Sequence, residues 1–282
     1  NPTGGASTIN NSGTIRKSAG AGTAIINILT NNTAATIDQA AGNIRFGAGG
    51  GFSGVTALTG TGLTLFGGTF VIADGSSFTS DLTITNSALV NVEGGLLLPT
   101  LNLSGGTLNI DTLAGSSTGD TLNANVINWT SGMTVSGGGS GILDIGSVDS
   151  MTLTGSAGSY ILDSITVNNA GTITYATTGN NLFLANGTLL SNSGLLDIQG
   201  DININPTGGA STINNSGTIR KSVGAGASNI AIATFNNSGA VDIQQGSLSL
   251  NGNDLVLGGG TLTGDGTFIG NIGVARKGSG EY

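Results

Sequence analysis

The sequence contains no cysteine and no histidine among its 282 residues. Without cysteine the chain forms no disulfide and offers no thiolate to a metal ion, so other contacts must hold its fold together. Without histidine there is no Ser-His-Asp or Cys-His arrangement and no imidazole zinc site. These two absences exclude most hydrolase mechanisms and leave carboxylate chemistry as the remaining catalytic alternative. We therefore expect no metal site and no cofactor.

Charged residues are also scarce, at 8% of the chain, and only seven residues are basic. The net charge of -8 argues against nucleic acid as a partner, because binding phosphate requires a cationic patch. No apolar run approaches the roughly 20 residues that cross a bilayer, so we expect no membrane insertion by this segment. The opening residues 1–3 recur later in the chain, which predicts a piece excised from a longer protein.

Glycine is abundant, with 52 residues, and Thr, Ser, Asn and aliphatic side chains fill most other positions. Short stretches such as 82–85 and 107–110 alternate apolar and polar residues, as half-buried strands do. Glycine pairs or Asn/Ser clusters close these stretches, and the gaps between them are too short for helices. The composition and the spacing therefore predict an all-β fold.

A repeated word organises residues 165–260. It contains a glycine at positions 171, 194, 217 and 239, so the steps from one word to the next are nearly equal. A period of this length is typical of solenoids. We expect a right-handed parallel β-helix, or β-solenoid, of about 12–13 coils of roughly 22 residues, forming a rod about 60 Å long.

Aligning the four words gives columns of like residues. Two columns are apolar, namely Val167, Leu190, Ile213 and Phe235, and Ile173, Leu196, Ile219 and Val241. A third column contains only asparagine, at Asn169, Asn192, Asn215 and Asn237. We expect this column to form a ladder of stacked amides at a turn, where Asn and Gly supply left-handed backbone.

A fourth column carries charge and contains Thr174, Asp197, Arg220 and Asp242. In this register Arg220 lies between two carboxylates, one coil before it and one coil after it. We expect the column to neutralise charge on the outer face of the sheet, where ion pairs contribute little to stability if they are exposed. Its role is therefore interpreted as structural.

A longer repeat overlies the short one. Residues 1–22 recur at 205–226 with a single change, Ala19 against Val223, which divides one continuous solenoid segment (1–282) into sub-blocks 1–204 and 205–282. In the first copy Asp38 falls in the column of Arg16, one coil further on, if one residue is inserted in the turn. Between residues 112 and 160 the spacing wanders, and the repeat predicts no register there.

Carboxylates and aromatic rings are the remaining candidates for chemistry. A glycan-cleaving site needs two carboxylates beside a sugar, and the close pairs are Asp144/Asp149, Asp197/Asp201 and Asp254/Asp265. The aromatic side chains that best suit a polar, glycan-binding surface are Trp129, Tyr160 and Tyr175. A tryptophan such as Trp129 more often fills the core or caps a rung than forms a platform for a ligand. No catalytic residue is assigned.

The words Asn-Asn-Ser-Gly-Thr-Ile (214–219) and Gly-Gly-Thr-Leu-Thr-Gly-Asp-Gly-Thr (259–267) resemble the passenger regions of bacterial autotransporters and filamentous-haemagglutinin-like adhesins. The resemblance implies export to the bacterial cell surface and a part in adhesion, aggregation or biofilm formation. It favours a non-enzymatic stalk or adhesive segment that meets a host, cell-surface or glycan receptor, or associates with itself end to end. A glycan-binding or glycan-cleaving β-helix is the alternative, and a surface-layer or sheath component is a lesser one.

Overall fold

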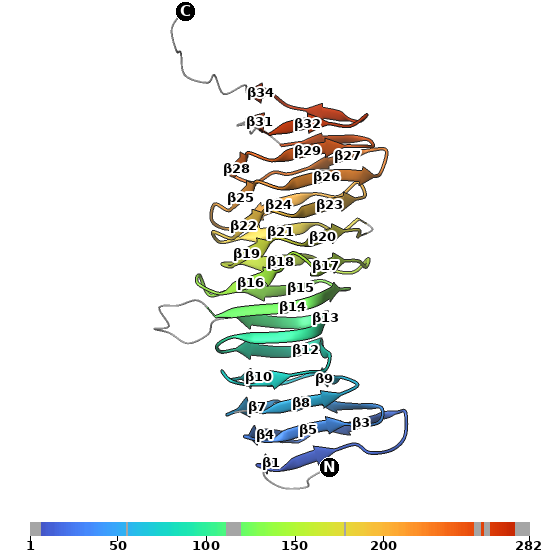
Figure 1. The fold of residues 1–282 in the computed structure, drawn as a ribbon, viewed down its shortest axis with the longest axis vertical. Coiled ribbons are helices and arrows are strands. Elements are labelled where there is room, and N and C mark those ends of the chain that lie inside the picture. Colours follow the sequence, from blue (N-terminus) through green and yellow to red (C-terminus); the bar gives the residue numbers. More distant parts are fainter. Residues whose placement is uncertain are drawn as a thin grey trace, which may run out of the picture.

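The computed structural model describes residues 7–54, 56–110, 120–177, 179–250, 255–256 and 260–273. These residues form strands joined by short turns, and none of them is helical. The described part of the chain therefore has no helix long and apolar enough to cross a membrane. Figure 1 shows the strands piled along the long axis, with the first strands at one end and the last at the other. The predicted all-β, parallel β-solenoid with roughly 22 residues per turn is confirmed.

Each coil of the solenoid contributes three strands, and the strands of successive coils pair in parallel to form three stacks. Stack 1 contains β1 (Thr8–Asn11), β4 (Leu29–Thr33), β7 (Gly50–Ser53), β10 (Thr69–Ile72), the ends of β12 (Leu82–Val92) and β13 (Leu96–Ile110), β15 (Met133–Ser136), β18 (Tyr160–Asp163), β21 (Leu182–Ala185), β24 (Ile204–Thr207), β27 (Ala227–Asn229), β30 (Ser247–Ser249) and β33 (Thr267–Ile269). Stack 2 contains β2 (Thr14–Arg16), β5 (Thr36–Gln39), β8 (Ala57–Gly60), β11 (Ser77–Phe78), the starts of β13 and β14 (Thr121–Trp129), β16 (Ile142–Ile145), β19 (Thr166–Asn169), β22 (Leu189–Asn192), β25 (Thr212–Asn215), β28 (Thr234–Asn237), β31 (Leu255–Val256) and β34 (Ile272–Gly273). Stack 3 contains β3 (Thr23–Ile26), β6 (Asn43–Phe46), β9 (Leu63–Leu65), the start of β12, the middle of β13, the end of β14, β17 (Ser150–Leu153), β20 (Thr172–Tyr175), β23 (Leu195–Gln199), β26 (Thr218–Val223), β29 (Ala240–Ile243) and β32 (Thr261–Thr263).

Turn length varies along the rod. Leu89 pairs with Thr107 in the next coil, and Thr107 pairs with Thr134 in the coil after that. The number of residues from Thr107 to Thr134 is half as large again as the number from Leu89 to Thr107. The regular repeat begins after this region, where Thr166 pairs with Leu189 and Leu189 pairs with Thr212 at equal steps. The wandering spacing of the middle of the sequence therefore reflects longer connections between strands that still pair in register.

The core runs the length of the rod inside the three stacks. Alternate residues of each strand point inward, so the predicted apolar columns are confirmed as ladders of buried side chains. Val167, Leu190 and Ile213 are all at most 1% exposed. Burying one such aliphatic side chain stabilises the fold by about 2 kcal/mol, and each coil contributes several of them. The hydrophobic contacts therefore act mainly between neighbouring coils.

Candidate functional site

The turns that lead from stack 2 to stack 3 form one continuous corner at residues 169–171, 192–194, 215–217 and 237–239, here named the Asn corner. The predicted asparagine ladder is confirmed at this corner. The side-chain amide of Asn169 donates to Oδ1 of Asn192 (2.6 Å), Asn192 donates to Asn215 (2.7 Å) and Asn215 donates to Asn237 (2.6 Å). All four side chains are buried, so the ladder supplies partners for amides that water does not reach.

The backbone of the Asn corner is also fully engaged. The carbonyl oxygen of Asn192 accepts hydrogen bonds from the N–H groups of both Ser216 (2.8 Å) and Gly217 (3.0 Å) in the next coil. The amide of Asn192 makes a second bond to the carbonyl oxygen of Thr218 (3.1 Å). The same bond recurs in the next coil, where the amide of Asn215 donates to the carbonyl oxygen of Ala240 (3.1 Å). Each coil therefore fixes the corner of the coil beside it.

The glycines of the Asn corner have a different role from the predicted one. Left-handed backbone lies one corner earlier, between stacks 1 and 2, at Ser164 (φ 50°) and Asn186 (φ 48°). At the Asn corner, a β-carbon added to Gly194 would lie 2.1 Å from the carbonyl oxygen of Gly171, and one added to Gly217 would lie 2.2 Å from that of Gly194. The glycine column is therefore required by the close approach of successive backbones. The expectation of left-handed Asn and Gly at this corner was wrong.

A groove runs along the outside of the Asn corner, over β19, β22, β25 and β28. It has a volume of about 610 Å³ and crosses four successive coils. Its outer side chains are Asn168, Ser191, Asn214 and Asn236 on the strands, and Ala170, Ser193, Ser216 and Ser238 at the turns. The buried ladder lies directly behind them. The groove was not predicted from the sequence. The available signal was the Asn-Asn pairs, in which the second Asn belongs to the buried ladder and the first points outward into the groove.

The charged column next to the groove is paired as predicted. Arg220 is aligned with Asp197 on one side and Asp242 on the other. Its guanidinium makes two bonds to Asp197, at 3.1 and 2.8 Å, and the Asp197 side chain is only 3% exposed. Burial raises the pKa of Asp197, but the hydrogen bonds from Arg220 and Gln199 outweigh it, so the pKa lies below its usual value. Asp197 is therefore a buried member of the column, because Arg220 and Gln199 bond to its carboxylate.

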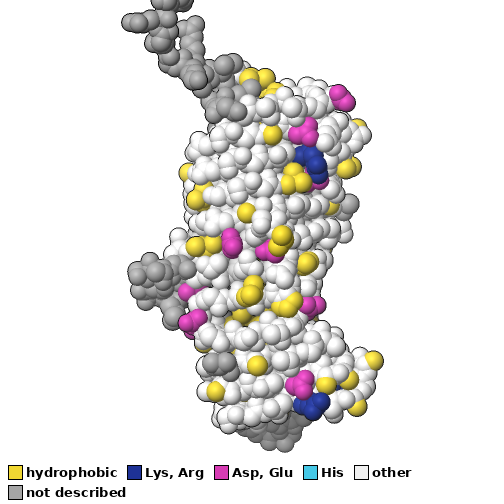
Figure 2. Space-filling model, in the orientation of Figure 1, with side chains coloured by type: hydrophobic (Ala, Val, Ile, Leu, Met, Phe, Trp, Pro, Cys, Tyr) yellow, Lys and Arg dark blue, Asp and Glu magenta, His cyan; other side chains and the backbone are white. Residues whose placement is uncertain are grey.

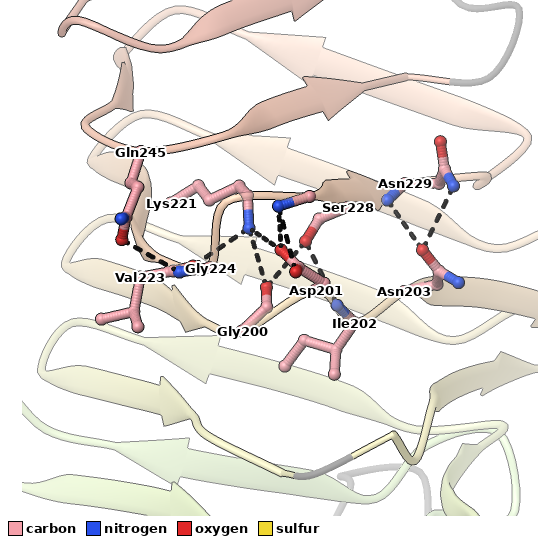
Figure 3. A network of polar contacts seen from close by, with 11 residues as sticks. Gly200, Asp201, Ile202, Asn203, Lys221, Val223, Gly224, Ser228, Asn229 and Gln245 are labelled. Atoms are coloured by element: carbon pink, nitrogen blue, oxygen red, sulfur yellow. Dashed lines mark hydrogen bonds and ion pairs between the residues drawn. The ribbon is translucent and has the colours of Figure 1, made fainter.

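Lys221 forms a polar cluster that the sequence analysis did not single out (Figure 3). Its register partners Ile198 and Ile243 are buried, and Lys221 is itself 0% exposed. The ammonium group donates to Oδ1 of Asp201 (3.0 Å) and to the carbonyl oxygens of Gly200 (2.9 Å) and Val223 (3.0 Å). The alternation of Ile219, Arg220 and Lys221 was the available signal, because it places the lysine on the inward side.

Asp201 completes this cluster from the neighbouring coil. Both of its carboxylate oxygens accept the N–H of Gly226, each at 3.0 Å, while Lys221 approaches from inside. The hydrogen bond from Lys221 holds the pKa of Asp201 below its usual value. The cluster joins residues from two coils and contains no free charge. Its geometry therefore fits a clamp between coils.

The three aromatic residues proposed for a glycan surface lie in the core. Trp129, Tyr160 and Tyr175 are each 0% exposed, and the rings of Trp129 and Tyr160 meet edge to face with centroids 5.3 Å apart. Trp129 Nε1 donates a hydrogen bond to the carbonyl oxygen of Ser131 (2.9 Å), and the Tyr160 hydroxyl donates one to the carbonyl oxygen of Thr154 (2.6 Å). Burial raises the pKa of both tyrosines. The three side chains do not lie on the polar surface that was expected for them, because they occupy inward positions of their strands. For Trp129 the interpretation as a core residue is correct.

The two carboxylate pairs that the structure describes in full have structural partners. Asp144 and Asp149 both accept hydrogen bonds from the Asn123 amide, at 3.3 and 3.4 Å, and Asp149 also accepts the N–H of Gly146. Asp197 and Asp201 are bound to different cations, Arg220 and Lys221. Asp254, the partner proposed for Asp265, lies outside the described residues. The pairs that are described bind to the neighbouring coils.

Within the described ranges, no group of three or more acidic side chains is placed to hold a metal ion. Among the described residues, the corner groove is a candidate site with a shape of its own. Comparisons with protein-family models, curated proteins and solved structures found no match to this chain.

Proposed function

We propose that the chain is a non-enzymatic stalk or adhesive segment of a large secreted bacterial surface protein, and that its physical role is to hold other parts at a distance from the cell. The observation that carries the proposal is the unbroken pairing of parallel coils from β1 to the C-terminal strands. Each coil bonds only to its neighbours, so such a rod grows by duplication without a redesigned core. The near-identity of residues 1–22 and 205–226 supports growth of that kind.

The surface supports the same role. On the face drawn in Figure 2 most side chains are neither charged nor hydrophobic, and the few charged groups are scattered. Large exposed apolar side chains are dispersed along the described chain, among them Leu97 and Val148. A polar, weakly charged surface keeps a long rod soluble outside the cell. The resemblance of the repeated words to autotransporter passengers and haemagglutinin-like adhesins supports an extracellular location.

A mechanical experiment tests the stalk. The whole 282-residue chain is held by its two ends and pulled in a single-molecule force experiment. We expect stepwise extension, with each coil of roughly 22 residues releasing about 75 Å of extended chain. A single event that releases the whole chain at once would contradict independent coils. Extension at forces indistinguishable from those of an unfolded chain would contradict a load-bearing role.

A second assay separates the stalk from a glycan-cleaving enzyme. The purified chain is incubated with a panel of plant, fungal and bacterial polysaccharides, and the release of reducing ends is measured. We expect no release above the level of the heat-denatured chain, because Asp149, Asp197 and Asp201 are engaged in contacts with neighbouring coils. Specific turnover of one polysaccharide would overturn the non-enzymatic assignment. A sheath or surface-layer role would instead appear as ordered arrays in electron micrographs.

A further inference from the structure

We propose that the groove outside the Asn corner is a binding site for an uncharged, linear polysaccharide that lies along the long axis of the rod. The proposal concerns the residues on β19, β22, β25 and β28 and does not depend on the stalk role. A rod that binds no sugar can still be a stalk, and a sugar-binding rod need not be one.

The floor of the groove is rigid before any ligand arrives. The amides of Asn192 and Asn215 each donate one hydrogen bond along the ladder and one to a backbone carbonyl oxygen of the next coil. The turns in front of them are fixed by paired backbone bonds between coils. A site that is already ordered loses little conformational entropy when a ligand binds.

The outer side chains retain hydrogen-bonding capacity that a ligand can use. Asn236 donates one amide hydrogen to Oδ1 of Asn214 (2.8 Å), and both side chains are exposed. An amide group offers two donors and two acceptor lone pairs, so most of this capacity stays open to the groove. The hydroxyls of Ser193 and Ser216 point back to carbonyls at 3.2 and 3.4 Å, which leaves their oxygens free to accept. A ligand that both donates and accepts through hydroxyl groups matches this surface.

Charge argues for a neutral ligand. None of the twelve side chains that line the groove is ionisable. Anionic polymers such as nucleic acids bind through cationic side chains, which this surface lacks. The lining also has no large aliphatic or aromatic side chain, so an apolar ligand would leave the amides without partners. Uncharged sugars are the polymer class that offers many hydroxyls without charge.

The dimensions suit a short stretch of such a polymer. Four coils at the strand spacing of about 4.8 Å give a track of roughly 15 Å along the axis. The volume of about 610 Å³ lies within the range of small-molecule sites. Equivalent Asn and Ser groups recur at every coil, so a polymer whose units repeat over a similar distance meets the same contacts at each step.

A peptide strand is a poorer occupant of the groove. Strands bind peptides by pairing with a free sheet edge. Here β22 and β25 are paired on both sides, and they run across the groove. Their backbone groups are therefore not available to a peptide that lies in the groove.

The test uses the whole chain and a defined set of probes. These are the linear hexasaccharides of β-1,4-glucose, β-1,3-glucose, β-1,4-mannose and β-1,4-xylose, with hexagalacturonate as the charged comparison. Binding is measured by calorimetry and by chemical-shift changes of the Asn side-chain amides. We expect at least one neutral hexasaccharide to bind with a Kd below about 1 mM and hexagalacturonate to bind at least tenfold more weakly.

The loss variant is the double substitution Asn214→Ala with Asn236→Ala, which removes two exposed amides and should leave the melting temperature unchanged. The matched control is Asn10→Ala with Asn31→Ala. These residues make the same hydrogen bond (3.2 Å), but in stack 1, where Gly51 and Val71 follow them. We expect at least tenfold weaker binding in the first variant and unchanged binding in the second.

Three results would overturn the proposal. One is failure of every neutral hexasaccharide to bind at millimolar concentration. Another is equal loss of binding in both double variants. The third is that two copies of the chain associate in the absence of sugar, as measured by sedimentation at several protein concentrations, and that only the first variant abolishes this association. The groove would then be a binding site for a second copy.

Discussion

Residues 7–22 and 211–226 have the same sequence apart from Ala19 and Val223, yet they lie on different sides of the solenoid. In the first copy β1 and β2 belong to stacks 1 and 2, whereas in the second β25 and β26 belong to stacks 2 and 3. The offset between the two copies therefore does not correspond to a whole number of turns. The local sequence determines the strand, the turn and the next strand, but the preceding chain determines the stack.

The two copies also bond to different neighbours. Arg16 pairs with Asp38 in the coil after it (3.1 Å), and both side chains are substantially exposed. Arg220 has a carboxylate aligned on both sides, and it pairs with Asp197 in the coil before it. Ser211 is buried in the second copy, whereas its equivalent Ser7 is exposed. Identical residues therefore differ in burial and in partner according to the coils around them.

The largest expected difference between the copies concerns the corner glycine. Gly217→Ala places a β-carbon 2.2 Å from the carbonyl oxygen of Gly194, whereas the nearest atom to a β-carbon at Gly13 is 4.0 Å away. We expect Gly217→Ala to lower the free energy of unfolding by about 3 kcal/mol, because neither backbone can move without breaking corner hydrogen bonds. Gly13→Ala should change it by less than about 0.5 kcal/mol.

Urea denaturation followed by circular dichroism measures this pair of variants, and hydrogen exchange locates the effect. Because coils of a solenoid can unfold in part, we expect lost protection in the coils around 194–217 and little change elsewhere. Equal destabilisation by both substitutions would contradict the role of coil spacing.

The next largest difference concerns the inward lysine. Lys221 is buried and bonds to Asp201 and two carbonyl oxygens, whereas Lys17 is partly exposed and bonds to the carbonyl oxygens of Ala19 and Gly20. Lys221→Met keeps most of the volume but leaves the two carbonyl oxygens without this donor. We expect a loss of about 2 kcal/mol, because Asp201 itself is partly exposed and water replaces the lysine there.

Lys17→Met should cost less than about 0.5 kcal/mol, since water reaches the groups that it leaves. Thermal melts of both variants provide the comparison. Lys221→Met would contradict the clamp between coils if it melts at the temperature of the unaltered chain.

The asparagine ladder gives a smaller difference. Asn215 accepts a bond from Asn192 and donates to Asn237 and to the carbonyl oxygen of Ala240. Asn11 donates to Asn32 at 3.0 Å and accepts the N–H of Gly13, and it is only partly buried. We expect Asn215→Ala to cost about 1.5 kcal/mol and Asn11→Ala about 0.5 kcal/mol. Chemical denaturation of the two variants measures the difference, and a larger loss at Asn11 would argue against burial as its cause.

The repeat made much of this architecture predictable. Equal spacing aligned Val167 with Leu190, Asn192 with Asn215, and Arg16 with Asp38, and all three pairings are present. Such predictions succeed because a parallel coil places like residues at like positions, and an alternating strand separates inward from outward side chains. The register alone was enough to locate the asparagine ladder.

Other features were not predictable from the repeat. The glycine column needed the distance between successive backbones, and the burial of Asp197 needed the direction in which Arg220 folds over it. The groove is formed by side chains of four successive coils, and the spacing of the strands does not predict a hollow there. The repeat could not place Trp129, because it predicts no register between residues 112 and 160. In the structure Trp129 pairs with Leu103 and Leu153, which gives it an inward position.

The smallest expected difference between the copies appears at low pH. The pKa of Asp197 lies below its usual value in the folded chain, so its pairing with Arg220 stabilises the fold fully above about pH 4 and loses that stabilisation as the pH falls through the folded pKa. Asp197→Asn should lower the free energy of unfolding at pH 7 by about 1 kcal/mol, a value reduced because Arg220 is about one third exposed. The same substitution should have no further effect at pH 2.

Asp38→Asn is the matched control in the first copy, where the pair is more exposed and should contribute less than about 0.3 kcal/mol. Melting temperatures of both variants and the unaltered chain, measured between pH 2 and pH 7, provide the test. We expect the curve of Asp197→Asn to converge with that of the unaltered chain as the pH falls through the folded pKa of Asp197, while Asp38→Asn follows it throughout. If the melting temperatures of the two variants depend on pH in the same way, the buried, bidentate pair at Asp197 contributes no more to stability than the exposed pair at Asp38. Neighbouring coils would then not determine the strength of the ion pair.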